Sequence, residues 1–419
     1  MPRMDAHSFD VIVAGAGMTG STAALALASG GLRVALVDPQ PFTAQTAPSF
    51  DGRASALAFS TFRALTALDV GRRLEPDAQP INQIVVTDGR SPGASAGTPS
   101  AFHLRFAADE IADRSGGEPL GYLVENRRIR TALAGAVERA DVTVMAPARV
   151  EAVEVEPARA RVTLADGRVL SAPLLVGAEG RASVVREAAG IGVVGWDYRQ
   201  TGLVATVRHA RPHGGVAYEH FLPGGPFAIL PLTDDRSSLV WTEPNRRAAA
   251  LKAASDEAFE AHLRRRFGEF LGDARVEGPR FAYPLGLQLA EQWTAPRIAL
   301  LGDAAHSIHP IAGQGLNLGM KDAAALAEVV VEAARLGEDI GAVGVLDRYA
   351  RWRRFDTVAL AAGTDLFTRL FSNDNPLLRT ARGLGLAAVN RVGPARRFFM
   401  REAGGAIGDL PRLLQGRAL

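Results

Sequence analysis

Two glycine-rich turns, one near each end of the chain, constrain the fold more than any other feature of the sequence. The first turn, Gly15–Gly20, follows an apolar run over residues 9–14 that is typical of a buried parallel strand. A helical pattern over residues 19–29 comes next, and a second strand over 33–37 ends at Asp38. This order of elements predicts a βαβ unit that carries a dinucleotide-binding turn.

Each residue of the first turn has a physical reason to be there. Gly15 permits the tight turn, Gly17 lets backbone N–H groups approach a pyrophosphate, and Gly20 allows close packing of helix and strand. The helix that follows presents its partially positive N-terminus to the phosphates. Asp38 stands at a strand end, where its carboxylate can accept hydrogen bonds from ribose hydroxyls.

The second turn lies far downstream, where a strand over 298–301 enters Gly302–Asp303 and a Gly-x-Gly turn opens a long helix. The carboxylate of Asp303 can bind the ribityl hydroxyls of a flavin. The first backbone N–H groups of the helix would point at the flavin N1–C2=O edge, where reduction builds negative charge; they belong to Gly315, Leu316 and Asn317. Two such turns favour one long cofactor held at both ends, and FAD fits better than NAD.

Composition bounds the number of domains and excludes several kinds of functional site. A chain of 419 residues predicts two or three domains, and a hydrophobic content of 47% supplies a sizeable core. The net charge is only +2, so we predict no nucleic-acid partner. The absence of cysteine excludes disulfides, thiolate metal sites and cysteine nucleophiles. His306 and His309 have no further ligand spaced to complete a metal site, so we predict none.

The two ends of the chain bear on location. The first ten residues lack the apolar segment of a leader, and no apolar run reaches the roughly 18 residues that a spanning helix needs. We therefore expect a cytoplasmic protein that could lie peripherally on the inner membrane. Residues 376–419 carry eight arginines and two acidic residues among apolar side chains. This region is either a membrane-surface or partner-binding segment, or helices packed on the domain with a solvated face.

The two turns bracket a region of alternating strands around residues 200–243, so the cofactor domain is expected to be discontinuous. The predicted fold class is α/β: a Rossmann-like FAD-binding domain with an inserted antiparallel-sheet substrate domain and a helical C-terminal region. The boundaries we predict are 1–75, 115–180 and 285–345 for the FAD-binding domain, 76–114 and 181–284 for the sheet domain, and 346–419 for the helical region.

Together these residues resemble the class A flavoprotein aromatic hydroxylases, whose best-known fold is that of p-hydroxybenzoate hydroxylase. The stretch from Gly302 to Asn317, which reads Gly-Asp-Ala-Ala-His, Pro and Gly-Gln-Gly-Leu-Asn, is specific for that superfamily. Leu370–Asn375 and Met400–Ala403 are similar to the ubiquinone-biosynthesis hydroxylase branch. Two departures stand out: Asp38 replaces the usual Glu, and Glu179–Gly180 replaces an Asp-Gly motif associated with FAD and the nicotinamide donor.

The resemblance implies site residues that local rules do not. By local rules Arg53 is equally well a surface arginine, and Asn126 is simply a helix N-cap. The resemblance places four groups in contact with FAD, namely Arg53, Asn126, the backbone at Val150, and Asp303. It also places a flavin-adjacent loop beside the isoalloxazine, with Pro310, Gly313 and Gly315. The resemblance assigns no side chain a definite catalytic role. In the inserted sheet, Tyr218, His220 and Phe221 could line a substrate pocket.

The activity that the resemblance implies is an FAD-dependent monooxygenase that hydroxylates the ring of a polyprenylated phenol in ubiquinone biosynthesis, through a flavin C4a-hydroperoxide formed with O₂. Its reductant would be NAD(P)H or a protein electron donor, and proteins of a quinone-synthesis complex are possible partners. Two alternatives stay open. One is a flavin-dependent reductase of an isoprenoid or other small molecule. The other is a non-catalytic, flavin-containing scaffold subunit of a quinone-synthesis complex.

Overall fold

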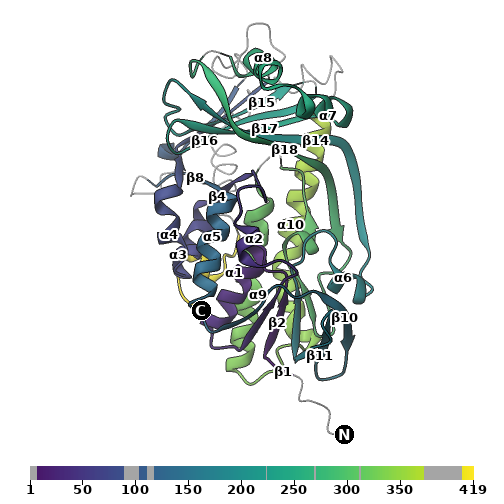
Figure 1. The fold of residues 1–419 in the computed structure, drawn as a ribbon. Coiled ribbons are helices and arrows are strands. Elements are labelled where there is room, and N and C mark those ends of the chain that lie inside the picture. The colour runs from purple at the N-terminus through teal and green to yellow at the C-terminus, as the bar shows by residue number, and fades with distance from the viewer. Residues whose placement is uncertain are drawn as a thin grey trace.

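The computed structural model describes residues 7–88, 103–110, 118–222, 224–268, 270–310, 313–371 and 408–419. Its architecture confirms the predicted α/β fold class (Figure 1). Parallel strands and long helices form the lower part of the view, and a large, mostly antiparallel sheet covered by short helices forms the upper part.

A six-stranded sheet forms the centre of the lower part, and five of its strands run parallel. Every residue of its middle strands is buried, which explains their uninterrupted apolar sequences. In spatial order the strands are β19 (Thr294–Ala295), β20 (Ile298–Leu300), β13 (Leu174–Gly177), β2 (Val11–Ala14), β3 (Val34–Val37) and β9 (Val142–Met145). The main helices packed against it are α1 (Met18–Ser29), α5 (Asn126–Val137) and α9 (Gly315–Arg335).

The order of these strands brings the two glycine-rich turns together. The strand β13 pairs with β2 on one side and with β20 on the other, all three parallel. The carboxyl ends of parallel strands meet at one edge of a sheet, so Gly15 after β2 and Gly302 after β20 lie at the same edge. Ligands of open α/β sheets bind at this edge.

An eight-stranded sheet forms the upper part of the molecule, with one helical layer on its outer face (Figure 1). In spatial order its strands are β21 (His306–Ser307), β18 (Ala274–Ala290), β14 (Val193–His209), β17 (Arg236–Pro244), β16 (Gly225–Leu232), β15 (Val216–Leu222), β6 (Gln83–Asp88) and β7 (His103–Ala107). The outer helices are α7 (Asn245–Ala253) and α8 (Asp256–Phe267), whose apolar side chains form a separate core with the sheet.

The inner face of this sheet packs against a three-stranded sheet that connects it to the rest of the molecule. The strands of the connecting sheet are β4 (Ala54–Ala58), β8 (Gly121–Glu125) and β5 (Gln79–Ile81). A fourth sheet contains β1 (His7–Ser8), β12 (Val169–Ala172), β11 (Ala160–Leu164) and β10 (Val150–Val155). Four short helices complete the fold: α2 (Phe42–Gln45), α3 (Phe59–Ala67), α4 (Gly71–Leu74) and α6 (Val184–Ala188). The domain boundaries given above stay a prediction.

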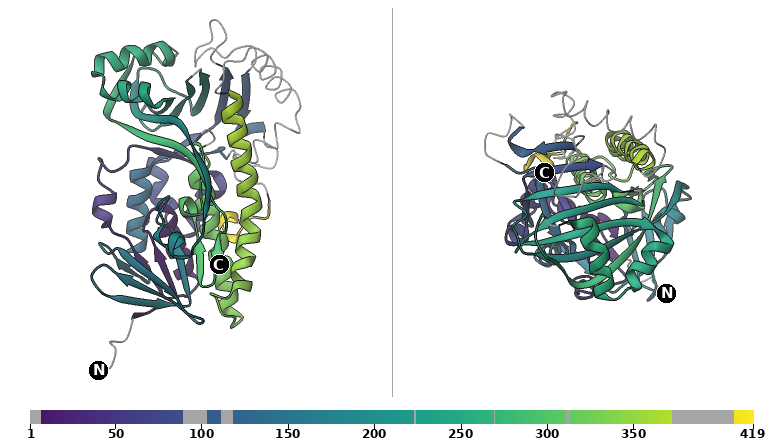
Figure 2. Two further views of the ribbon diagram at one scale, coloured as in Figure 1. Left: turned by 90° about the vertical axis from the view of Figure 1, so that its right-hand side faces the viewer. Right: turned by 90° about the horizontal axis from the view of Figure 1, so that it is seen from above.

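A long helix, α10 (Val343–Phe371), follows α9 and runs beside the curved strands β14 and β18 (Figure 2). The chain is next described at residue 408, so most of the arginine-rich segment lies outside the described residues. None of the described helices is long and apolar enough to cross a bilayer.

The last described segment is anchored in the core. Leu413 and Leu414 are each 1% exposed, and Arg412 forms ion pairs with Glu328 and Glu332 of α9. The backbone N–H of Arg412 also donates to the carboxylate of Glu328 at 2.6 Å. At least this arginine therefore serves the fold rather than a membrane.

We expect Leu414→Ala to lower the free energy of unfolding by about 2–5 kcal/mol, because it opens a cavity under the chain terminus. Arg412→Ala removes only half-exposed ion pairs, so its loss should stay at or below about 1 kcal/mol. Urea denaturation of the two variants measures both values. Equal losses would show that the ion pairs, not the two leucines, hold the terminus.

Candidate FAD site

The first glycine-rich turn has the geometry of a phosphate cradle. Gly15 has φ +100°, and a Cβ there would lie 2.5 Å from the carbonyl oxygen of Ala178. A Cβ on Gly20 would lie 1.9 Å from the carbonyl oxygen of Gly15, so both outer glycines are required for packing. Gly17 is different, because a Cβ there would meet no atom within 4 Å. The open space above Gly17, at the N-terminus of α1, fits a pyrophosphate.

Asp38 lies beside this turn, as the βαβ pattern predicts. Its carboxylate accepts a hydrogen bond of 2.7 Å from the backbone N–H of Ala16 and one of 2.8 Å from that of Gln40. Burial raises the pKa of Asp38, and these two backbone hydrogen bonds oppose the rise. The backbone carbonyl of Asp38 accepts from Ala148, two residues before Val150, which brings the start of β10 to the same end of β3.

Asp303 occupies a short 3₁₀ turn, Gly302–Ala304, directly after β20. Its side chain is exposed to solvent, yet the protein around it raises its pKa, while His306, Arg53 and Arg181 act in the opposite direction. A side chain with both properties lines a recess rather than an outer surface.

The start of α9 is fixed to the connecting sheet by the side chain of Asn317. Its amide nitrogen donates to the carbonyl of Ala56 at 2.8 Å, and its amide oxygen accepts from the N–H of Ala58 at 2.9 Å. The backbone N–H groups of a first helical turn have no partner within the helix. A Cβ on Gly315 would meet nothing within 4 Å, so this helix end also has space in front of it. Pro310 is exposed, and the two residues after it lie outside the described residues.

Arg53 is held by a buried carboxylate that sequence reasoning did not assign to the site. Asp51 accepts hydrogen bonds of 2.9 Å from both Nε and Nη2 of Arg53, and further ones from Asn126, Arg130 and Tyr283. The Arg53 guanidinium also stacks on the ring of Tyr283, 4.6 Å from its centroid. Burial alone would raise the pKa of Asp51, but Arg53 and Asn126 outweigh it and hold that pKa far below its usual range.

The expectation that Asn126 caps a helix is wrong. Glu125 occupies the N-cap position, and Asn126 is the first residue of α5. The amide of Asn126 instead donates to Asp51 at 3.0 Å and accepts from the hydroxyl of Ser55 at 2.6 Å. Its partners lie more than 70 positions away in the sequence, so no local pattern could have indicated this role.

Asp51→Asn should leave the guanidinium of Arg53 without its bidentate partner. We expect FAD to dissociate about tenfold more easily, because one charged hydrogen-bonded pair is worth about 1.5–3 kcal/mol. Fluorescence titration of the apoprotein with FAD measures the change. Asp166→Asn is a matched control, because that exposed carboxylate pairs with Arg168 on a remote hairpin. FAD affinity that is unchanged in Asp51→Asn would remove Arg53 from the site.

Comparison with known proteins decides which cofactor fold this is. The sequence matches the FAD binding domain family over residues 8–359. It is 46% identical over 411 residues to the ubiquinone hydroxylase UbiL of Rhodospirillum rubrum. This alignment covers 97% of this chain and 92% of that protein. The chain belongs to this family of FAD-dependent monooxygenases. It is also 34% identical over 399 residues to the 3-demethoxyubiquinol 3-hydroxylase of Escherichia coli, with 94% of this chain and 98% of that protein covered.

A solved structure shares the fold. The p-nitrophenol 4-monooxygenase PnpA of Pseudomonas putida superposes with a TM-score of 0.77 at 19% identity, covering 94% of this chain and 98% of that one. FAD is the cofactor of the family to which the chain belongs, as the two turns predicted. The resemblance to class A aromatic hydroxylases of the ubiquinone branch is confirmed.

Glu179, a departure from the family's usual Asp-Gly motif, serves the backbone. Its carboxylate accepts hydrogen bonds from the Ser183 hydroxyl at 2.7 Å and from the N–H of Val185 at 3.0 Å, both at the start of α6. Arg186 of that helix then donates to the carbonyls of Arg181 and Ala304. This bracing connects the Glu-Gly turn to the turn that carries Asp303.

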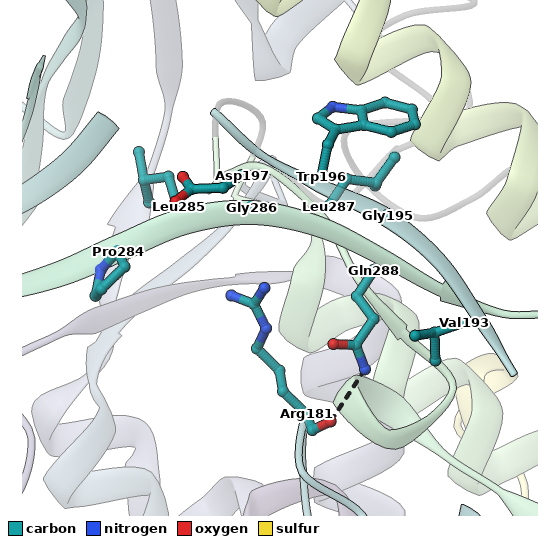
Figure 3. Close-up of a pocket in the computed structure, with 10 residues that line it drawn as sticks. All are labelled: Arg181, Val193, Gly195, Trp196, Asp197, Pro284, Leu285, Gly286, Leu287 and Gln288. Atoms are coloured by element: carbon teal, nitrogen blue, oxygen red, sulfur yellow. Dashed lines mark hydrogen bonds between the residues drawn. The ribbon is translucent and has the colours of Figure 1, made fainter. Parts of the chain in front are cut away.

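Arg181 faces a pocket between the long strands β14 and β18 (Figure 3). The side chain of Gln288 donates to the backbone carbonyl of Arg181 at 3.0 Å, which the dashed line in Figure 3 marks. The guanidinium lies under the strand backbone near Gly286 and also influences Asp303. The pocket therefore adjoins the Asp303 turn from the side of the two long strands.

The three residues considered for a substrate pocket lie on different faces of the upper sheet. Tyr218 packs edge-on against Phe270 in the outer helical layer, with ring centroids 4.9 Å apart. His220, on the same face of β15, contacts Thr87 of β6. Phe221 has the opposite parity and joins an apolar cluster with Leu104 and Leu120 on β7 and before β8. The structure does not bring these three side chains together.

A second buried network was not predicted from the sequence. Asp322, in the middle of α9, accepts hydrogen bonds from His306 Nε2 at 2.5 Å, from Arg353 Nε at 3.1 Å and from the N–H of Gly302 at 3.2 Å. Burial would raise the pKa of Asp322, but His306 and Arg353 outweigh burial and lower it. The network joins α9, α10 and the turn that carries Asp303. His306 therefore has a structural role, as the partner of Asp322.

Asp303→Ala should fold normally, because its carboxylate is exposed, and should retain less FAD. We expect flavin content after gel filtration to fall at least about tenfold, the loss expected for a hydrogen-bonding group in a site. The absorbance ratio of flavin to protein measures it. Asp356→Ala, which removes a half-exposed carboxylate on α10, is the control. Full flavin content in Asp303→Ala would exclude this carboxylate from the cofactor site.

Proposed function

We propose that this protein hydroxylates the aromatic ring of a polyprenylated phenol in ubiquinone biosynthesis, with O₂ as the source of the oxygen atom. The relatives that match nearly the whole length of this chain support the proposal, since they are named ubiquinone hydroxylase and 3-demethoxyubiquinol 3-hydroxylase. The observation that carries it is the meeting of both glycine-rich turns at one sheet edge, facing the inner side of the upper sheet.

The proposed arrangement of FAD follows the edge from α1 to α9. The pyrophosphate would lie over Gly17 and the adenosine ribose at Asp38. The ribityl chain would lie at Asp303 and the isoalloxazine beside residues 310–317. Arg53, Asn126 and the backbone at Val150 would complete the contacts. The support for this arrangement is the open space at Gly17 and Gly315 and the recessed carboxylate of Asp303.

The protein groups in this arrangement bind, orient and stabilise charge. The N-terminus of α9 would place partial positive charge beside the edge of the flavin that becomes negative on reduction. Bound FAD would supply the redox chemistry: with electrons from NAD(P)H or a protein donor, one atom of O₂ would go to the ring and the other to water. The inner face of the upper sheet keeps water away and holds the ring in line.

Quinone profiling of cells that lack the protein tests the proposal. We expect an under-hydroxylated polyprenyl phenol to accumulate and to disappear when the wild-type gene is restored. The Gly17→Val variant, which we expect to bind no FAD, should fail to restore it. An unchanged quinone pool would contradict the proposal and favour a reductase of another small molecule. Restoration by the FAD-free variant would favour a scaffold role.

We further propose that the arginines of residues 376–401 hold the protein at an anionic membrane surface, where so apolar a substrate resides. Deleting the whole C-terminal region is a poor test, because Leu413 and Leu414 are core residues. A better test keeps both leucines and changes five arginines to glutamine: Arg379, Arg382, Arg391, Arg396 and Arg397. We expect binding to vesicles with anionic lipid to fall at least about tenfold, since each arginine near the surface adds about 1 kcal/mol. Unchanged binding would instead favour a partner protein as the ligand of this region.

A further inference from the structure

Glu219 lies in the middle of β15, and the alternation of that strand decides which way its side chain points. Tyr218 packs against Phe270 in the outer helical layer. Successive side chains of a strand point to opposite faces, so Glu219 belongs to the inner face of the sheet. Ala217 and Phe221, which share its parity, lie in apolar clusters on that inner side.

The inner face at Glu219 connects to the proposed flavin loop through three contacts. Ala228 of β16 is the register partner of Glu219. Leu230, the next residue of β16 on the same face, shares an apolar cluster with Ala56 of β4. The carbonyl of Ala56 accepts the hydrogen bond from Asn317 at the start of α9. Glu219 thus lies on the sheet face that packs against the connecting sheet, to which the start of α9 is hydrogen-bonded.

The surroundings of Glu219 offer its carboxyl group no polar contact. Its register neighbours are Val86 on β6 and Ala228 on β16, and it makes no hydrogen bond or ion pair with any described residue. The side chain is partly exposed, yet burial raises the pKa of Glu219 to about 8 and no charged group opposes the rise. A recess again accounts for both properties. With no partner among the described residues, the carboxyl group is available to a ligand that lies against the inner face of the sheet.

We propose that Glu219 binds the ring oxygens of the substrate and so fixes which ring carbon faces the flavin. A neutral carboxyl group has one donor and one acceptor. It can donate to one ring oxygen while it accepts from the phenolic hydroxyl. The apolar side chains beside it can hold a prenylated ring but cannot orient it, so the carboxyl group supplies the orientation. This inference rests on the proposed function, because it assigns a residue to the ring of that substrate.

Two substitutions separate this role from a structural one. Glu219→Leu removes hydrogen bonding, whereas Glu219→Gln keeps one donor and one acceptor at the same size. The holoenzyme is assayed with a 2-prenylphenol of shortened chain, and hydroxylated product is counted per NAD(P)H consumed. We expect Glu219→Leu to raise KM at least about tenfold and to divert NAD(P)H oxidation to hydrogen peroxide, while Glu219→Gln stays close to wild type. Glu151→Leu, at an exposed strand position, is the matched control.

Stability measurements distinguish a structural role from a substrate-binding role, because only a structural role predicts that Glu219→Leu is destabilised. Because Glu219 has no partner to lose, Glu219→Leu should unfold at the same or a higher urea concentration than wild type. A destabilised Glu219→Leu, or one with wild-type KM and coupling, would overturn the inference, and so would a Glu219→Gln variant as impaired as Glu219→Leu.

Titration of the oxidised holoenzyme with the same phenol, followed by flavin absorbance, separates this inference from the proposed function. If wild type binds the phenol without hydroxylating it and Glu219→Leu does not bind, the proposed function fails while Glu219 keeps its role. If wild type does not bind the phenol, both fail.

Discussion

Gly17→Val is expected to give a folded protein that purifies without FAD. Gly17 has extended backbone angles, φ −65° and ψ −179°, which valine adopts without strain. The Cβ of the new side chain meets no protein atom within 4 Å, but the side chain fills the space in which the pyrophosphate would approach the start of α1. We expect FAD affinity to fall at least about a hundredfold, or about 2.7 kcal/mol. Flavin absorbance of the purified protein, followed by FAD titration, measures the loss.

Two comparisons make this result specific. Gly344→Val introduces the same side chain at an exposed glycine that also has nothing within 4 Å, and it should keep wild-type flavin content. The urea midpoint of Gly17→Val should match that of wild-type apoprotein, because no core contact changes. Wild-type flavin content in Gly17→Val would show that the first turn does not hold the pyrophosphate, whatever the fold.

Asp322→Ala is expected to be the most destabilising single substitution in the described part of the site. Asp322 and Arg353 are 0% and 2% exposed, so removing the carboxylate leaves a guanidinium buried without its main partner. Breaking such a pair costs about 3–5 kcal/mol. Asp322 also holds the N–H of Gly302, so the turn carrying Asp303 should loosen and FAD binding should weaken as well. Urea denaturation of the apoprotein separates the two effects.

The pH dependence of the stability lost in Asp322→Ala identifies the Asp322 carboxylate as the source of that stability. The folded-state pKa of Asp322 lies below its ordinary value of 3.8. Its contribution is therefore fully present above about pH 4 and disappears as the pH falls through the folded-state pKa. The difference between wild type and Asp322→Ala should accordingly stay constant at neutral pH and shrink only in acid. Asp347→Ala, on the surface of α10, should change stability by no more than about 0.5 kcal/mol. An equal loss in both variants would contradict the account.

Local signals carried most of what the sequence revealed. The strand, the glycine turn and the helix of the βαβ unit are consecutive, so Gly15, Gly17 and Asp38 could be assigned from spacing alone. The turn at Asp303 could be assigned in the same way, because β20 directly precedes it. The structure places each of these residues at the turn or strand end that its local pattern predicts.

Residues whose partners are distant in the sequence could not be found in this way. Asp51 accepts hydrogen bonds from Arg53, from α5 and from β18, and Asp322 joins α9 to α10, so no local pattern indicates either network. The face of β15 was equally hidden, because alternation shows which residues share a face but not which face is inner. The sequence therefore favours Tyr218 as a pocket residue, and it does not distinguish Glu219 from any other polar residue of a strand.

Hydroxylation of a prenylated phenol by the purified holoenzyme under ¹⁸O₂ tests the central claim most directly. The protein, loaded with FAD and supplied with NAD(P)H, is given the phenol, and the product is analysed by mass spectrometry. We predict a product that carries one ¹⁸O atom on the ring, and none with the Gly17→Val variant. A reduced product without label, or label that derives from water, would contradict a flavin monooxygenase acting on this ring.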